Sequence, residues 1–175
     1  SGAYSFGSYD SNPYILMNFS GELRDVFTLI HEAGHSMHSY YTRRTQPFVY
    51  GGHSIFTAEV ASTVNETLLI HYLLSNAESV DMKKYLINFY IDEFKSTLFR
   101  QTMFAEFEKI AHETVENGGS LTAQYLNEEY DKLNTLYYGP AIEHDEYIQY
   151  EWSRIPHFYR AYYVYQYATG YSAAN

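Results

Sequence analysis

Apolar side chains recur every three or four positions over most of the chain, which is the spacing of amphipathic helices. The clearest case is residues 22–44, where the apolar or small positions are Leu23, Val26, Phe27, Ile30, Ala33, Gly34 and Met37. Glu22 and Asp25 begin this stretch and Arg43 and Arg44 end it, an arrangement that suits the helix dipole. The pattern therefore predicts a helix over residues 22–44 with one buried face.

Three more helices and a final helical run are predicted downstream. Their ranges are 54–74, 81–117, 120–138 and the tyrosine-rich stretch after Pro156. Gly118-Gly119 and Gly139-Pro140 stop the second and third of these, because glycine and proline end helices readily. Residues 45–54 contain Pro47 and two glycines and are predicted to form a loop.

One stretch before the first helix has the character of a strand. Residues 14–20, YILMNFS, form a short apolar run between Pro13 and Gly21. Residues 1–13 are rich in glycine, serine and asparagine and are predicted to be loop. The expected fold is therefore mainly α, with one short strand region before the helix at residues 22–44.

The charge and the cysteine content exclude several kinds of function. The chain has no cysteine, so it forms neither a disulfide framework nor a thiolate metal site. Its 11 Lys and Arg residues against 21 Asp and Glu residues give a net charge of -10, which argues against a nucleic-acid partner. No apolar run approaches the roughly 18 residues of a membrane span, so no membrane partner is expected. The lack of cysteine fits a reducing compartment, and we expect a cytoplasmic location.

Three histidines and one glutamate fall within residues 31–38, HEAGHSMH, inside the first predicted helix. His31 and His35 are about 40° apart around a helix and one turn apart along it, so their rings can converge on one ion. Glu32 is displaced by about 100° from His31, so it can lie beside the water of such a site and accept its proton. This is the HExxH arrangement of two zinc ligands and a general base.

His38 lies on the same helical face, but it is not expected to be the third ligand. Seven residues place it about 10 Å from His31 along the helix axis, whereas zinc–nitrogen bonds are about 2 Å long. The longer motif HExxHxxGxxH is excluded as well, because His38 stands at its glycine position and Tyr41 at its last histidine.

The third ligand is then expected on another helix, where a carboxylate is the usual choice. Residues 54–74 offer Glu59 and Glu66, which are seven residues apart and share one helical face. Their spacing leaves both open as the ligand. Whichever of them binds the metal, the other is placed to orient an imidazole.

HEAGHSMH, followed by FTAEVAST at residues 56–63, resembles the thimet oligopeptidase family of zinc metallopeptidases. The lead-in SGAYSFGSYDSNPYILMNFSG and the closing HFYRAYYVYQYATG are similar to its oligoendopeptidase F branch, and the likeness covers all 175 residues. Members of the family are considerably longer chains. Residues 1–175 are therefore expected to be a single catalytic-core segment of a longer metallopeptidase, which fits a chain that starts at Ser1 without a methionine.

The resemblance implies a role for each residue of the zinc motifs. His31, His35 and Glu59 match the three ligands of one Zn²⁺ per chain, so the resemblance favours Glu59 over Glu66. Glu32 matches the general base.

The resemblance also implies two catalytic residues in the late segment. His157 and Tyr162 match a His and a Tyr that stabilise the oxyanion in related members. The thimet branch has a glycine-rich stretch here, whereas this chain has FYRAYY, so neither Tyr165 nor Tyr167 is assigned as a further donor.

The fold implied by the resemblance is a zincin-like helical metallopeptidase core. The implied activity is zinc-dependent endoproteolysis of short oligopeptides through a metal-activated water. Two alternatives are a metal-binding helical module that is catalytically incompetent as a fragment and a purely structural helical domain. Metal content separates the structural domain from the other two, and peptide turnover separates the enzyme from the metal-binding module. The sequence does not indicate an oligomeric state.

Overall fold

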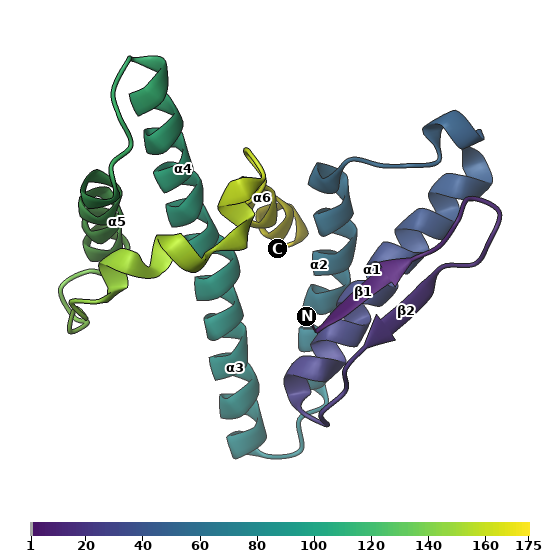
Figure 1. Ribbon diagram of the computed structural model, residues 1–175. Coiled ribbons are helices and arrows are strands. Elements are labelled where there is room, and N and C mark those ends of the chain that lie inside the picture. The colour runs from purple at the N-terminus through teal and green to yellow at the C-terminus, as the bar shows by residue number, and fades with distance from the viewer. Residues whose placement is uncertain (1) are drawn as a thin grey trace. The chain divides into compact units, whose positions relative to one another are not determined.

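A computed structural model describes residues 2–175 and confirms a mainly α fold with one small sheet (Figure 1). The helices are α1 (Leu23–Thr45), α2 (Ile55–Ser75), α3 (Val80–Phe94), α4 (Arg100–Glu116), α5 (Ala123–Tyr138) and α6 (Tyr165–Ala174). Shorter 3-10 turns are η1 (Phe48–Tyr50), η3 (Ile148–Arg154) and η4 (Pro156–Tyr159). Among residues 2–175, none of the helices is long and apolar enough to cross a membrane.

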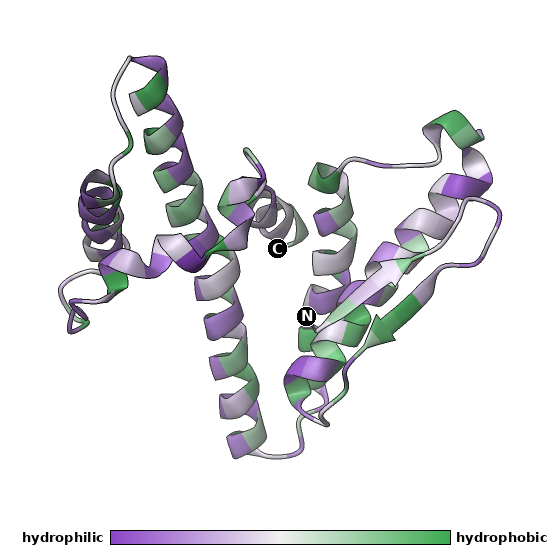
Figure 2. Ribbon diagram, in the orientation of Figure 1, coloured by the Kyte–Doolittle hydropathy of each residue, from purple (hydrophilic) through white to green (hydrophobic). Residues whose placement is uncertain are grey.

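The sheet is a hairpin of β1 (Ala3–Phe6) and β2 (Tyr14–Met17), which lies along α1 (Figure 1). The prediction of a strand in residues 14–20 is confirmed, but the prediction of loop for residues 3–6 is wrong. The composition of these residues is typical of a loop. They form a strand because their backbone N–H and C=O groups are hydrogen-bonded to those of β2 in an antiparallel pair. The face opposite α1 is exposed and apolar, and Figure 2 shows the hydrophobic residues of β2.

The predicted helices at residues 22–44, 54–74 and 120–138 are confirmed within a few residues. The third predicted helix, residues 81–117, is also helical throughout, but it is not a single α-helix. A π-helical turn, η2 (Lys95–Phe99), separates α3 from α4. A single π-helical turn inside a helix changes the spacing of apolar residues only slightly, so it cannot be recognised from one sequence.

The chain folds as two compact units. The first runs through Glu93 and includes Thr169–Asn175, and the second is Phe94–Ala168. The prediction that residues 1–175 form a single catalytic-core segment concerns a longer protein and stays a prediction.

The second unit has a core of buried apolar side chains next to the buried carboxylate of Glu151. The apolar residues are Met103, Phe104, Phe107, Tyr130, Leu133, Ile155 and Val164. Glu151 accepts hydrogen bonds from Arg100 at 2.6 Å and from the Tyr130 hydroxyl at 2.7 Å, and it also pairs with Arg154. Burial acts to raise the pKa of Glu151, but these donors and charges outweigh burial and lower it.

The core of the first unit lies where α1, α2 and α3 meet, around Phe27, Ile70 and Leu86. The start of α1 is fixed by Asp25, whose carboxylate accepts the backbone N–H groups of Ser20 and Glu22 at 2.7 and 3.0 Å. These two hydrogen bonds hold the pKa of Asp25 below its usual value.

Gly34 allows α1 and α2 to approach each other closely. A Cβ atom at this position would lie 2.7 Å from the Cα atom of Ser62 and 2.8 Å from the carbonyl oxygen of Ala61. Both neighbours are backbone atoms of α2, so they cannot turn aside as a flexible side chain could. The two helices therefore pack backbone to backbone at this point, between the turns that carry His31 and His35.

We predict that Gly34→Ala destabilises the protein. Alanine is about 1 kcal/mol better than glycine in a helix interior, but overpacking costs about 1–3 kcal/mol and here the collision is with backbone. The measurement is urea unfolding of both proteins. Gly52→Ala is the control, because an added Cβ at Gly52 meets nothing within 4 Å. A Gly34→Ala variant as stable as the parent would contradict the close approach.

Candidate active site

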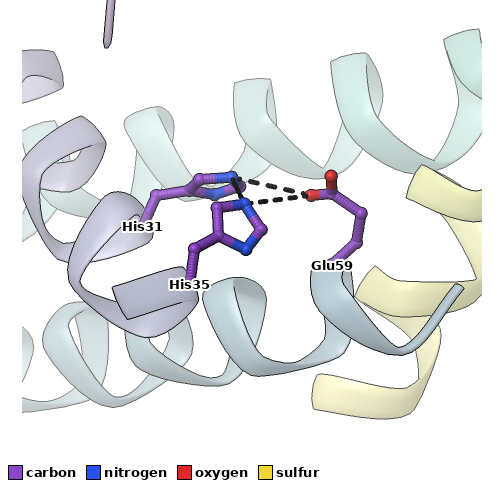
Figure 3. Close-up of side chains that lie close together, drawn as sticks. All are labelled: His31, His35 and Glu59. Carbon is purple, nitrogen blue, oxygen red and sulfur yellow. Dashed lines mark hydrogen bonds and ion pairs between the residues drawn. The ribbon is translucent and has the colours of Figure 1, made fainter. Parts of the chain in front are cut away.

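His31 and His35 lie one turn apart on α1 and point their Nε2 atoms at each other (Figure 3). The two Nε2 atoms are 3.0 Å apart. Both side chains are partly buried, with one quarter or less of their surface exposed. The convergence expected from the i, i+4 spacing is therefore present.

Glu59 on α2 completes the group from the facing helix (Figure 3). Its Oε2 atom is 3.6 Å from Nε2 of His31 and 4.0 Å from Nε2 of His35. Its backbone is also crowded by α6, because a Cβ on Gly170 would lie 3.1 Å from the backbone carbonyl carbon of Glu59. Packing on two sides thus fixes the point from which this carboxylate reaches the histidines.

The three donors fit a small tetrahedral cation. Bonds of about 2.0–2.2 Å to nitrogen and oxygen in a tetrahedron place the ligand atoms roughly 3.3 Å apart. The observed separations of 3.0, 3.6 and 4.0 Å lie around that value. Of the described residues, His31, His35 and Glu59 are the ones that form such a group, with ligand atoms all within 4.8 Å of one another.

Burial sets the direction of the pKa shift for two members of this group, His35 and Glu59. It lowers the pKa of His35 to about 4, with the nearby His31, His53 and His38 acting in the same direction. It also raises the pKa of Glu59. A neutral imidazole is the form that binds a metal, and a bound cation would favour the ionised form of Glu59.

Glu66 lies on the other side of His31. Its Oε1 atom is 2.9 Å from Nδ1 of His31, so the geometry separates the two carboxylates that the spacing had left open. Burial acts to lower the pKa of His31, but the hydrogen bond and charge of Glu66, with the charge of Glu59, raise it. A carboxylate on Nδ1 fixes the tautomer and the ring orientation, leaving Nε2 to act as a ligand.

Glu32 is buried beside this group, with only 8 % of its surface exposed. Burial raises its pKa, opposed by the charge of His31 and by a hydrogen bond to the backbone of Ser5 in β1. The hairpin is tied to α1 a second time, through the hydroxyls of Ser5 and Ser36 at 2.9 Å. A buried carboxylate with a raised pKa near a metal site is suited to accept and return a proton.

His38 is not part of the three-donor group, as the rise along α1 predicts. Its ring stacks on His53, in the loop before α2, with ring centroids 3.9 Å apart. The Nδ1 atoms of both rings are buried without a hydrogen-bond partner in the described chain. Burial lowers the pKa of each histidine. Sequence reasoning missed His53, because a loop histidine gives no periodic signal.

The predicted late residues, His157 and Tyr162, belong to the second unit. His157 lies in η4 and is half-buried, and its ring stacks on Tyr163 with centroids 5.5 Å apart. The Tyr163 hydroxyl is hydrogen-bonded to that of Tyr167 at 2.5 Å. The role of His157 at the oxyanion stays a prediction.

Tyr162 adopts an unusual backbone conformation. Its φ is 55°, the one positive value of a non-glycine residue within residues 2–175. Such a conformation costs about 1–3 kcal/mol and tends to occur at functional sites. The backbone N–H of Tyr162 donates to the carboxylate of Glu108, and its ring stacks on His112. Neither partner could be found from sequence spacing, because both are about 50 residues away along the chain.

Curated relatives match the chain along nearly its whole length. Oligopeptidase PepF of Bacillus subtilis is 56% identical over 174 residues, and Group B oligopeptidase PepB of Streptococcus agalactiae is 53% identical over 175. The plasmid-encoded oligoendopeptidase F of Lactococcus lactis is 52% identical over 175 residues. The matches cover 26%, 29% and 29% of these proteins, so the chain spans less than a third of their length.

Solved structures agree with the sequence relatives. The crystal structure of oligoendopeptidase-F from Enterococcus faecium superimposes with a TM-score of 0.72 at 52% identity, over 87% of this chain and 27% of that one. A crystal structure from Chlamydophila abortus gives a TM-score of 0.83 at 49% identity, over 97% of this chain and 29% of the other. A model of peptidase family M3 matches residues 1–175. The resemblance to oligoendopeptidase F is confirmed, and the chain belongs to peptidase family M3.

Proposed function

We propose that this chain carries the catalytic site of a cytoplasmic zinc endopeptidase that hydrolyses short oligopeptides. The observation that carries the proposal is the group of His31, His35 and Glu59, with the buried Glu32 next to it on α1. This combination of two imidazoles, one carboxylate ligand and one free carboxylate is the minimal set for metal-assisted hydrolysis. The relatives named above are oligopeptidases, which supports oligopeptides as the substrate class.

When bound, Zn²⁺ supplies a Lewis acid that polarises the scissile carbonyl and lowers the pKa of a water. His31, His35 and Glu59 would hold this ion. Glu32 accepts the proton of the attacking water at its carboxylate and passes it to the departing amine nitrogen. Glu32 must take a proton from the water and later give it to the amine nitrogen. Its raised pKa makes its carboxylate a better acceptor in the first of these transfers.

The supporting residues act on orientation. Glu66 holds the His31 ring through Nδ1, and the hairpin holds Glu32 through Ser5. Within the described chain β1 pairs with β2 alone, and we propose that its second edge pairs with extended substrate backbone, as edge strands do in strand-addition complexes. β1 is the strand of the hairpin that contacts Glu32.

We also propose that His157 and Tyr162 donate hydrogen bonds to the oxyanion that forms at the scissile carbonyl. Preorganised donors at this position act on the transition state more than on the bound substrate. The exposure of Tyr162 and its strained backbone support a role beyond packing, because a packing residue needs neither.

One alternative keeps the metal site without the activity. In this alternative, residues 1–175 alone bind zinc but lack the walls that hold a peptide, because the chain spans 26–29% of these curated relatives. Zinc analysis and peptide turnover, measured on this chain and on the full-length protein, separate the two functions.

The first prediction concerns the metal ligands. We expect His35→Ala to lose stoichiometric zinc, because two protein ligands hold the ion far more weakly than three. The measurement is metal analysis after dialysis against a weak chelator. His71→Ala, an exposed histidine on α2, is the control and should keep one zinc per chain. Tight retention of zinc in His35→Ala would contradict the ligand assignment.

The second prediction separates the base from the ligands. Glu32→Gln should retain zinc and lose nearly all turnover, because an amide cannot accept the proton of the water at neutral pH. Metal analysis is run beside hydrolysis of a quenched fluorescent peptide by the full-length protein. Glu78→Gln, at an exposed position, should change neither quantity. If Glu32→Gln lost zinc, Glu32 would be a ligand rather than the base.

The third prediction concerns Tyr162. Tyr162→Phe keeps the ring and removes one hydroxyl, so kcat should fall by about a hundredfold or more, with a much smaller change in KM. Tyr159→Phe, whose side chain is 87% exposed, should leave kcat unchanged. An unchanged kcat with a lowered melting temperature in Tyr162→Phe would make Tyr162 a packing residue.

A further inference from the structure

Two side chains of one helix hold Tyr162 at two different points. Glu108 and His112 are four residues apart on α4, so they share one face of it. The carboxylate of Glu108 accepts the backbone N–H of Tyr162. The ring of His112 stacks on the ring of Tyr162, with centroids 4.6 Å apart and planes 28° apart. Successive turns of α4 thus hold the backbone and the side chain of the same residue.

The backbone of Tyr162 needs such support. A tyrosine at φ 55° is in the left-handed region, which persists only where the surroundings enforce it. Glu108 is 5% exposed, so water competes little for its carboxylate. Glu108 therefore provides a specific reason for Tyr162 to keep this conformation.

Tyr162 stays accessible at the surface in spite of these two contacts. Its side chain is 51% exposed even though its ring is stacked and its amide is bonded. The two α4 side chains also line a pocket of about 350 Å³ together with Phe107 and Phe158, so this face of α4 is open rather than packed. If Tyr162 served only to fill the core, its ring would be buried against the apolar side chains of this pocket, Phe107 and Phe158.

We infer that Glu108 and His112 are positioning residues, which hold Tyr162 in a strained conformation so that its hydroxyl is presented to the oxyanion. This inference rests on the role proposed above for Tyr162. Glu108 fixes where the backbone turns, and His112 fixes the plane of the ring. Neither side chain touches the substrate, and each acts through Tyr162.

The first test is independent of catalysis. Hydrogen–deuterium exchange of the Tyr162 amide is followed by fragmentation mass spectrometry in the full-length protein. Exchange should be about tenfold faster or more in Glu108→Ala, because its acceptor is lost. It should stay slow in Glu108→Gln, which keeps an acceptor oxygen of the same reach. Glu116→Ala, at the exposed end of α4, is the control.

The second test asks whether the positioning reaches the chemistry. With a quenched fluorescent oligopeptide, Glu108→Ala should lower kcat by about tenfold or more while KM changes little. Glu108→Gln should recover most of the loss. The double variant Glu108→Ala/Tyr162→Phe should be no slower than Tyr162→Phe alone, because residues acting through one another are not additive.

The outcomes separate the inference from the proposal on which it rests. Unchanged amide exchange in Glu108→Ala would overturn the positioning role, whatever the kinetics of Tyr162→Phe. Additive losses in the double variant would overturn it as well, because Glu108 would then act by another route. Unchanged kcat in Tyr162→Phe would contradict the oxyanion role itself. Circular dichroism and melting curves of Glu108→Gln show whether the variant is folded, so that a folding defect is not mistaken for lost positioning.

Discussion

The close contact of α1 with α2 at Gly34 is the constraint on which the candidate active site depends. His31 and His35 share a face because they lie on one helix, but the third donor comes from a second helix. The distance of this third donor from the two histidines is set by how closely the backbones of α1 and α2 approach each other. With no side chain at Gly34, the helix meets the backbone of Ser62 directly, and Glu59 reaches within 4.0 Å of both histidines. Any larger residue at this position would widen the site.

Three carboxylates next to the histidines have different environments, and the environments explain how one residue type can serve three roles. Glu59 points at the Nε2 atoms of both rings, whereas Glu66 is hydrogen-bonded to the Nδ1 atom of His31. Glu32 follows His31 in the chain but points elsewhere, and it is buried under the β1–β2 hairpin. The proposed ligand, orienting group and base thus differ in the direction of their carboxylates rather than in their chemistry. The hairpin takes part because it covers Glu32, the proposed base, and hydrogen-bonds to it.

Local features of this molecule could be predicted from its sequence, whereas contacts between distant segments could not. The helices follow from apolar spacing, and the convergence of His31 and His35 follows from the geometry of a single turn. Spacing alone left Glu59 and Glu66 equivalent, because their difference lies in how α2 is rotated against α1. The strand at Ala3–Phe6 was missed for a related reason. It is a strand because it pairs with Tyr14–Met17, and its own composition does not indicate one. The π-helical turn between α3 and α4 likewise left no mark on the periodicity.

The most direct measurement of the central claim is an anomalous-scattering map of the crystalline protein, recorded on both sides of the zinc absorption edge. The account predicts one peak per chain, present above the edge and absent below it, within bonding distance of Nε2 of His31, Nε2 of His35 and a carboxylate oxygen of Glu59. A zinc peak bound by Glu66 in place of Glu59, or one at the stacked pair of His38 and His53 with none at His31, would contradict it.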